Sequence, residues 1–431
     1  MNRLIAAEVS TLTRYCGRVV QWCPRDEDPG YLLSRIVSPH ASVATRLEDL
    51  PDAGGSAGGP TVILLNGNLN HHYDIQGLLE ELGTALDRSS RIIAVVYNSY
   101  LRAVYVLANW LGMRHGELPT TFLTERDLES LAALAGYSMV RIRPAVYVPW
   151  ALLGLGTLLN KVLPTIPLVR KLGFASLVVL RPIRPVTGRK PSLSIVIPAR
   201  NERANIESAL ARIPDLGTEV EIIFVEGHST DGTWEEIQAA VVRGSPRFKL
   251  QAHRQTGTGK SDAVRLGFSR ATGDLLVVLD ADLSVPPELL GRFLAAYGAG
   301  LADFVNGTRL AYPMEAQAMR FLNRLGNVFF ARALSWVTDA RLGDVLCGTK
   351  LMARRDYLRM AEWRRDFGEF DPFGDFELLF PAAVLGLGIV DVPVRYRART
   401  YGSTNIRRFR HGAQLLRMVA IGWLRIKLGR S

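Results

Sequence analysis

The chain is organised around the stretch LLVVLDADL, residues 275–283. Its first five residues are apolar, which predicts a strand buried on both faces of a parallel sheet. Asp280 and Asp282 follow at the carboxyl end of this strand, where open α/β sheets bind their ligands. Two carboxylates there are hard oxygen donors that suit Mg²⁺ or Mn²⁺ together with the oxygens of a diphosphate. The alternative is a strand whose exit turn carries Asp by chance.

The composition bounds the class of protein. A chain of 431 residues with 48% apolar content predicts two globular domains, each with a sizeable core. The three cysteines, Cys16, Cys23 and Cys347, fit neither a zinc site nor a disulfide framework, which suits a reducing cytoplasm. The first residues lack a cleavable-signal pattern, and no uninterrupted apolar run of about twenty residues occurs. We therefore expect a chain that does not span a bilayer.

The net charge of +11 is concentrated at the C-terminus, because residues 395–431 hold ten Arg or Lys and no Asp or Glu. Nucleic acid and an anionic membrane surface are both reasonable partners for such a tail, and a solvated basic tail is the alternative. One helical face of the tail gathers Leu416, Val419, Ala420, Trp423 and Ile426. Residues 406–431 thus predict a basic amphipathic helix that lies on a membrane, or else one that packs on its own domain.

The first half of the chain alternates predicted strands and helices. The strands are expected at residues 17–22, 61–66, 91–98, 137–143 and 175–180, and the helices at 75–86 and 124–135. The second of these helices has a capping sequence at Thr124 to Asp127 and a stop at Gly136. This alternation predicts an α/β domain.

The phrases TVILLNGNLNHHYDI, RIIAVVYNS and FLTERDLESLAALAGYSMVRI resemble the C-terminal half of a class I S-adenosylmethionine-dependent methyltransferase over residues 60–182. The resemblance fails where the cofactor would bind, because the first strand runs into VVQWCP, residues 19–24, without a glycine. We expect residues 1–182 to form a degenerate, partial Rossmann-type domain that is structural or regulatory and does not bind S-adenosylmethionine. Methyltransferase activity of this domain is the alternative.

Two segments separate this domain from the second half. Residues 146–169 are strongly apolar but are interrupted by three prolines and Lys161. A buried helical hairpin, a domain interface and an interfacial membrane contact all remain open for them. Residues 183–191 are basic, proline-rich and without pattern, which predicts a linker.

The second half predicts a parallel sheet with strands at residues 193–198, 220–225, 248–252 and 275–279, each followed by a helix. Its phrases IVIPARNERANI, FVEGHSTDGT, GKSDAVRLGF, DADLSVPPEL, NGTR, CGTKLMAR and VPVRYRARTYGSTNI resemble family 2 glycosyltransferases of the polyprenyl-phosphate sugar transferase type. The resemblance implies a GT-A fold for residues 192–405. It departs from the family at Glu226-Gly227, where many members have two Asp, and at Ser284, where mannosyl enzymes often have Gln.

The resemblance implies inverting transfer of a sugar from a nucleotide sugar, with a polyprenyl phosphate as the expected acceptor and Mg²⁺ or Mn²⁺ as the cofactor. Nucleotide-sugar contacts are expected from Pro198, Ala199, Asn201, Glu202, Glu226, Lys260, Asp262 and Asp280. The divalent ion is expected on Asp280 and Asp282, where it neutralises the leaving diphosphate. The acceptor phosphate is expected on Arg309, Arg320 and Arg324, for each of which a surface role is the alternative.

Asp375 and Glu377 lie in the phrase GDFE and are expected near the acceptor. A phosphate acceptor is ionised at pH 7, so neither carboxylate needs to act as a strong base. We expect a cytoplasmic protein at the inner face of the plasma membrane, reached through the C-terminal helix, and no nucleic-acid partner. The identity of the sugar cannot be read, because it depends on the shape of the pocket.

One or two residues decide against each of two further alternatives. The phrase GTGKS, residues 257–261, mimics a phosphate-binding P-loop, but that loop needs a glycine where Arg254 stands. A non-catalytic membrane-bound scaffold would not need the acidic pair Asp280 and Asp282. Both alternatives are therefore less favoured than the transferase.

Overall fold

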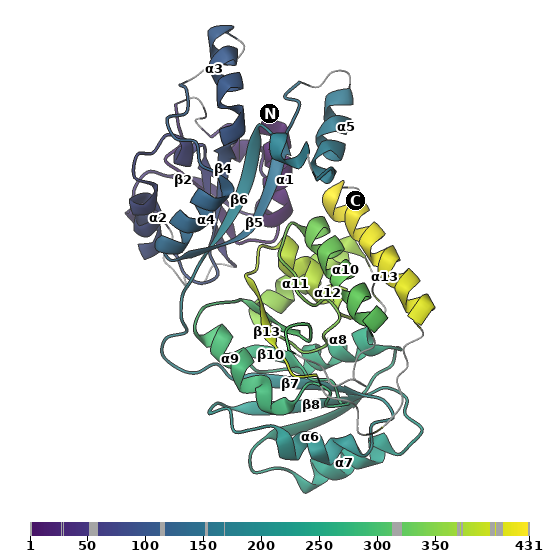
Figure 1. Ribbon diagram of the computed structural model, residues 1–431. Coiled ribbons are helices and arrows are strands. Elements are labelled where there is room, and N and C mark those ends of the chain that lie inside the picture. Colours follow the sequence, from purple (N-terminus) through teal and green to yellow (C-terminus); the bar gives the residue numbers. More distant parts are fainter. Residues whose placement is uncertain are drawn as a thin grey trace. The chain divides into compact units, whose positions relative to one another are not determined.

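The structure is a computed structural model that describes residues 2–26, 28, 30–50, 59–112, 117–150, 154–167, 169–312, 321–368, 371, 374–396, 401 and 408–429. The chain forms two compact units. Unit 1 comprises Met1–Arg184, Ala383–Leu387 and Leu424–Ser431, and unit 2 comprises Pro185–Ala382 and Gly388–Trp423 (Figure 1). Both units are built on mixed sheets flanked by helices.

Unit 1 holds a six-stranded sheet in the order β2-β1-β3-β4-β6-β5. Its strands are β1 (Arg18–Trp22), β2 (Ala41–Ala44), β3 (Thr61–Asn66), β4 (Arg91–Tyr97), β5 (Tyr137–Val146) and β6 (Ala175–Pro182). Its helices are α1 (Asn2–Thr13), α2 (Ile75–Thr84), α3 (Arg102–Trp110), α4 (Glu125–Leu134) and α5 (Leu155–Val162). Strands β1 to β4 are parallel, while β6 runs antiparallel to both β4 and β5.

The local patterns of unit 1 predicted β1, β3, β4, β5, β6, α2 and α4, whereas α1, β2 and α3 were not predicted. Strand β3 has the predicted bounds, and its four central residues are buried, as a continuous apolar run requires. Helix α4 begins at a capping box, in which Thr124 accepts the backbone N–H of Asp127 and the Asp127 carboxylate accepts that of Thr124. Strands β5 and β6 extend further than predicted, because they pair antiparallel with each other from end to end.

Unit 2 holds a seven-stranded sheet in the order β13-β11-β12-β10-β7-β8-β9. Its strands are β7 (Leu193–Ala199), β8 (Val220–Glu226), β9 (Lys249–Arg254), β10 (Leu275–Val278), β11 (Phe304–Thr308), β12 (Lys350–Ala353) and β13 (Ile389–Pro393). Its helices are α6 (Asn205–Arg212), α7 (Thr233–Arg243), α8 (Lys260–Arg270), α9 (Leu290–Gly298), α10 (Phe321–Thr338), α11 (Arg354–Phe367), α12 (Phe376–Val384) and α13 (Arg408–Gly422).

The order of the parallel strands in unit 2 reverses beside β7. Strands β7, β8 and β9 follow one another to one side, and β10 returns to the other side of β7. Strand β12 then pairs antiparallel with both β10 and β11. The carboxyl ends of β7 and β10 thus flank a topological switch point, which is where open α/β sheets bind ligands.

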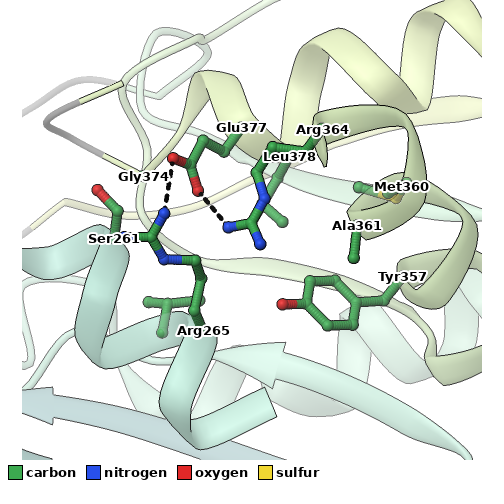
Figure 2. A pocket seen from close by; sticks show the side chains of 10 residues that line it. Ser261, Arg265, Tyr357, Met360, Ala361, Arg364, Gly374, Glu377 and Leu378 are labelled. Atoms are coloured by element: carbon green, nitrogen blue, oxygen red, sulfur yellow. Dashed lines mark hydrogen bonds and ion pairs between the residues drawn. The ribbon is translucent and has the colours of Figure 1, made fainter. Parts of the chain in front are cut away.

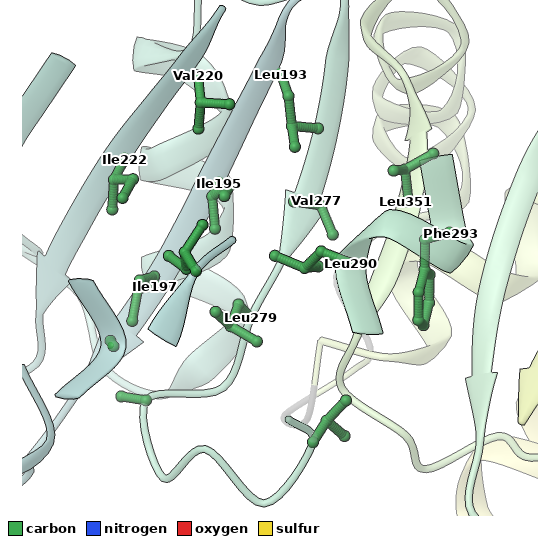
Figure 3. Packing of buried hydrophobic residues seen from close by; sticks show 14 of the residues in the cluster. Leu193, Ile195, Ile197, Val220, Ile222, Val277, Leu279, Leu290, Phe293 and Leu351 are labelled. Carbon is green, nitrogen blue, oxygen red and sulfur yellow. The ribbon is translucent and has the colours of Figure 1, made fainter. Parts of the chain in front are cut away.

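The core on one face of this sheet is apolar and continuous (Figure 3). Leu193, Ile195 and Ile197 point to this face from alternate positions of β7. Leu279 lies on the same face beyond β10, and α9 lies over this face with Leu290 and Phe293. This packing fixes the register of β10 and hence where its exit turn begins.

The C-terminal helix packs on its own unit. Leu415, Met418 and Gly422 of α13 are buried, and a Cβ on Gly422 would lie 2.9 Å from Val337 Cγ1 of α10. The predicted apolar face is offset from this buried face, since Leu416 is 53% exposed. Among the described residues, no helix is both long and apolar enough to cross a bilayer.

Candidate active site

The exit turn of β10 holds the two predicted metal ligands. The N–H of Leu279 still donates to the carbonyl of Val196 on β7, at 3.0 Å, and the chain then leaves the sheet. The turn is tight, because Leu283 takes a positive φ of 52° and donates its N–H to the Asp280 carbonyl at 3.1 Å. Asp282 Oδ1 accepts the N–H of Ser284 at 3.0 Å. The turn therefore presents both carboxylates at the switch point.

Asp280 is paired with Lys260, the first residue of α8. Burial lowers the pKa of Lys260, but the charges of Asp280, Asp375 and Asp282 outweigh burial and raise the pKa overall. Burial raises the pKa of Asp280, and the charge and hydrogen bond of Lys260 reverse this to a net lowering. Both groups are thus held charged, and three of the predicted site carboxylates share one lysine as a neighbour.

Gly348 allows this pair to lie where it does. A Cβ built on Gly348 would collide with Asp280 Oδ2 and with Lys260 Nζ, and it would lie 2.7 Å from Asp280 Cγ. Only glycine lets the backbone between Cys347 and Lys350 pass so close to the two charged groups. Sequence analysis did not single out this residue within the phrase CGTK.

Asp375 precedes α12 and is paired with a second lysine. Lys350 Nζ of β12 lies 2.6 Å from Asp375 Oδ1, and Lys350 is fully buried. Lys350 also donates to the carbonyl of Cys347. Lys350 was not identified from the sequence, because its partner lies 25 residues further along the chain.

Glu377 has a different role in the structure (Figure 2). It is 6% exposed and lies between two guanidinium groups, with Arg265 Nη1 at 3.3 Å from one carboxylate oxygen and Arg364 Nη1 at 3.1 Å from the other. Arg265 lies on α8 and Arg364 on α11, so the Glu377 carboxylate joins three helices. A small pocket opens beside this cluster and is lined by Tyr357 among others.

The loop before α12 is fixed to the start of α8. Asp371 Oδ2 accepts the backbone N–H groups of Phe376 and Glu377, at 2.7 and 3.1 Å, and so caps α12. Ser261 Oγ donates to the carbonyl of Asp371 at 2.9 Å. Gly374 has a φ of +83°, and a Cβ there would lie 3.1 Å from Ser261 Cα. Asp375 is thereby positioned by the same helix that carries Lys260.

The loops after β7 and β8 form the predicted donor side. Ala199 pairs with Glu226 in the sheet, so residues 198–202 and Glu226 meet at the carboxyl edge. Asn201 has a positive φ of 56°, and its Oδ1 accepts the N–H of Thr230 at 2.9 Å. These bonds hold the two loops together beside the switch point.

The acidic groups on the donor side form hydrogen bonds or ion pairs within the protein. Glu226 is 3% exposed, accepts the N–H of Ser229 and forms an ion pair with Arg254, whose Nε lies 3.4 Å from Glu226 Oε2. Glu202 Oε2 accepts the Asn205 amide at 2.6 Å.

At the far end of this edge, Asp262 Oδ2 accepts the N–H of Gly257 at 3.1 Å and so orders the turn into α8. Gln255, the residue after β9, is 4% exposed, and its buried Oε1 has no hydrogen-bond partner in the part of the chain that the structure describes. A buried acceptor of this kind is costly unless a ligand or water meets it. The sequence carried no signal for it.

The arginines predicted to hold the acceptor phosphate are not equivalent. Arg309 forms a bidentate pair with buried Asp344, with Nε–Oδ2 at 2.8 Å and Nη2–Oδ1 at 2.9 Å. Burial raises the pKa of Asp344, but the hydrogen bonds and charge of Arg309 lower it to about 2. Arg324 is exposed on α10, and Arg320 lies outside the described residues. The phosphate role of all three stays a prediction.

The carboxylates fit a divalent ion that is shared with a ligand. No group of three or more His, Cys, Asp or Glu that could hold a metal occurs within the described ranges. Asp280 and Asp282 supply two hard oxygen donors, so the remaining coordination positions would go to diphosphate oxygens and water. The chemistry of this donor pair fits Mg²⁺ or Mn²⁺ bound together with a nucleotide.

Part of the chain matches a known protein family and its members in sequence. Residues 194–360 match the model of glycosyl transferase family 2. The chain is 31% identical over 227 residues to a dolichyl-phosphate hexose transferase of Haloferax volcanii, a match that covers 52% of this chain and 90% of that protein. It is 30% identical over 224 residues to a dolichol-phosphate mannosyltransferase of Pyrococcus furiosus, which covers 50% of this chain and spans 59% of that protein's length.

Among solved structures, the chain is similar to glucosyl-3-phosphoglycerate synthase from Mycobacterium tuberculosis in complex with Mn²⁺, UDP-glucose and glycerol 3-phosphate. The TM-score is 0.41 and the identity 20%, over 55% of this chain and 80% of that one. The family model and the Haloferax volcanii relative decide the assignment. The chain belongs to glycosyl transferase family 2, and unit 2 carries its glycosyltransferase domain, with the GT-A-like fold that the sequence predicted.

Proposed function

We propose that the chain is an inverting glycosyltransferase that moves a sugar from a nucleotide sugar to a polyprenyl phosphate. The observation that carries this proposal is the convergence of Asp280, Asp282 and Lys260 at the switch point, with Asp375 close enough to act on the same lysine. The relatives are named for transfer to dolichol phosphate, which supports a lipid-phosphate acceptor.

The donor would bind across the carboxyl ends of β7, β8 and β10. Residues 198–202 and Glu226 would frame the nucleoside, and the unsatisfied Gln255 Oε1 would accept one N–H or hydroxyl hydrogen from it. Asp280 and Asp282 would hold a divalent ion, which supplies charge neutralisation for the leaving diphosphate. Lys260 is long and charged, and it lies at the N-terminus of α8, so it would contact the diphosphate as a second positive group.

In the chemical step, an oxygen of the acceptor phosphate attacks the anomeric carbon as the bond from that carbon to the diphosphate oxygen breaks. The acceptor oxygen is already ionised, so no proton has to be removed. The pairing of Asp375 with Lys350 and of Glu377 with two arginines agrees with this, because neither carboxylate is left as an isolated base. Lys350 would instead hold Asp375 in place beside the acceptor. Arg320 and Arg324 would supply positive charge to the acceptor phosphate, whereas the charge of Arg309 is balanced by Asp344.

The experiment is transfer of labelled hexose from a panel of GDP- and UDP-sugars to polyprenyl phosphate by the purified protein, with Mn²⁺ or Mg²⁺ present. Label in the organic phase supports the proposal, and a chelator should abolish it. Arg324→Ala should raise the KM for the lipid phosphate and leave the KM for the donor unchanged. Arg365→Ala, an exposed arginine on α11, is the matched control.

Unit 1 is proposed to be a methyltransferase-like domain without catalytic function. The strand order β2-β1-β3-β4 corresponds to strands 2, 1, 4 and 5 of a Rossmann sheet. The antiparallel strands β6 and β5 follow at the edge beside β4. Its switch point between β1 and β3 is bridged by the chain itself, because Asn68 Nδ2 donates to the carbonyls of Trp22 and Cys23, at 3.2 and 3.0 Å. Calorimetry should detect no binding of S-adenosylmethionine, and saturable binding would revive the methyltransferase alternative.

Location is part of the proposal. A lipid-phosphate acceptor requires the protein to work at a membrane, and the sequence predicts the inner face of the plasma membrane. The face of α13 that carries exposed Leu416 and Arg417 is a candidate contact, since the opposite face is used for packing.

A further inference from the structure

Two helices of unit 1 leave large apolar side chains in solvent. On α3 only Tyr105 is buried, while Trp110 is 80% exposed. On and around α5, Trp150 and Leu158 are each 57% exposed. The other exposed apolar residues of these two segments are Tyr100, Val104, Val106, Leu107, Leu111, Leu155, Val162, Ile166 and Leu172. A concentration of this kind marks an interaction surface on a soluble protein.

The two segments leave the sheet of unit 1 at the same end. Tyr97, the last residue of β4, pairs with Ala175, the first residue of β6, and Ala175 also pairs with Val146 at the end of β5. The chain therefore enters α3 and α5 from the same end of the sheet, and both helices extend beyond that end in Figure 1. Asn98 Nδ2 ties the segments together by donating to the carbonyls of Lys171 and Gly173, both at 2.7 Å.

The charges of this surface all have one sign. Residues 99–112 contain Arg102 as their single charged residue, and residues 154–172 contain Lys161, Arg170 and Lys171 and no Asp or Glu. Lys161 and Lys171 are exposed. Exposed tryptophan, exposed aliphatic side chains and lysine are the composition of a segment that rests at the interface of an anionic bilayer. If this apolar surface bound another protein, the charged residues of the surface would not all need to be positive.

The geometry of the helices agrees with surface contact and not with insertion. Helix α3 has 9 residues and α5 has 8, which at about 1.5 Å per residue makes each less than half the thickness of a hydrocarbon core of about 30 Å. Side chains such as Trp110 could enter the headgroup region while the helix stays outside the core.

We infer that unit 1 is a membrane-docking module, which binds an anionic lipid surface through α3, α5 and the residues flanking them. This inference goes beyond the proposed sugar transfer and does not depend on it, because lipid binding can be measured without donor or acceptor. It gives a function to a Rossmann-type unit whose own switch point is closed by Asn68.

The test is co-sedimentation of the full chain with vesicles of phosphatidylcholine containing about 30% phosphatidylglycerol. The wild-type chain should bind these vesicles and should bind pure phosphatidylcholine more weakly. Trp110→Asp with Leu158→Asp should weaken partitioning about tenfold or more, because two interfacial apolar side chains are replaced by anions. Lys161→Gln with Lys171→Gln should weaken binding roughly fivefold for each charge removed, and only on anionic vesicles.

Val242→Asp on α7 is the matched control, because Val242 is 88% exposed in unit 2, and it should bind as the wild type does. Leu416→Asp tests whether α13 accounts for the binding instead. Unchanged melting by circular dichroism shows that the variants are folded, as expected for side chains that pack on nothing. Full vesicle binding by the folded Trp110 and Leu158 variant overturns the inference, and so does loss of binding in Leu416→Asp alone. A wild type that ignores the vesicles but forms dimers that the same variant dissociates also overturns it.

Discussion

Replacement of Lys260 by methionine should change how the free protein binds a divalent ion. In the structure Lys260 Nζ pairs with Asp280 Oδ1, and Asp282 is a further neighbour of the same ammonium. An ion that binds these carboxylates must therefore compete with a built-in cation. Methionine has a similar length and no charge, so Lys260→Met removes the competitor and leaves Asp280 without the cation that it pairs with.

The size of the effect follows from the geometry. Two unit charges about 4 Å apart interact by about 4 kcal/mol at an effective dielectric constant of 20. The side chains of Lys260 and Asp280 are 31% and 25% exposed, so solvent reduces this to about 1–3 kcal/mol. Since about 1.4 kcal/mol equals a factor of ten, Mn²⁺ in the absence of nucleotide should bind roughly 5- to 150-fold more tightly to Lys260→Met. With nucleoside diphosphate present the variant should lose affinity, because the second positive group for the phosphates is gone.

The assay is titration of Mn²⁺ followed by electron paramagnetic resonance of the free ion, with and without nucleoside diphosphate. Lys249→Met, an exposed lysine at the start of β9, is the matched control and should behave as the wild type. If Mn²⁺ alone binds the wild type and Lys260→Met equally, the ammonium does not hold the metal position, and the reasoning about this site is refuted.

Three further perturbations have defined outcomes. Asp344→Asn should lower the free energy of unfolding by about 3–5 kcal/mol in urea titrations, because it leaves Arg309 buried without its anion. The folded-state pKa of Asp344 is depressed to about 2, so this stabilisation is present above pH 4, is lost between about pH 4 and 2, and should be missing from the acid-unfolding curve of the variant. Gly348→Ala should weaken nucleotide binding about 10- to 100-fold in calorimetry and also lower the melting temperature, because its Cβ collides with Asp280. Glu377→Gln should lower both kcat and melting temperature, whereas a purely catalytic carboxylate would affect kcat alone.

The elements that the sequence predicted best are those that a local pattern determines. Residues 275–279 were predicted as a buried strand, and β10 lies in the middle of the sheet with Asp280 at its exit. The switch point itself could be expected only in outline, because the pairing of β12 between β10 and β11 is antiparallel and non-local. No periodicity in the sequence indicates that a strand will insert antiparallel between two others.

The features that were missed depend on partners distant in the chain. Lys350 is 25 residues from Asp375, and Arg309 is 35 residues from Asp344, so neither pair could be recognised without the fold. The same reason explains the difference at the C-terminal helix, where the apolar face expected from the sequence is not the face that packs on α10. Leu416 is apolar yet 53% exposed, whereas Leu415 and Met418 are buried.

The most direct test of the central claim is organic-phase transfer of labelled sugar by the wild type and by Asp282→Asn, at equal concentration and with Mn²⁺ present. The account predicts transfer to polyprenyl phosphate by the wild type and a loss of at least a hundredfold in the variant, with melting unchanged, since one donor of the ion is replaced by a neutral amide. Full transfer by Asp282→Asn, or no transfer by the wild type with any nucleotide sugar, would contradict it.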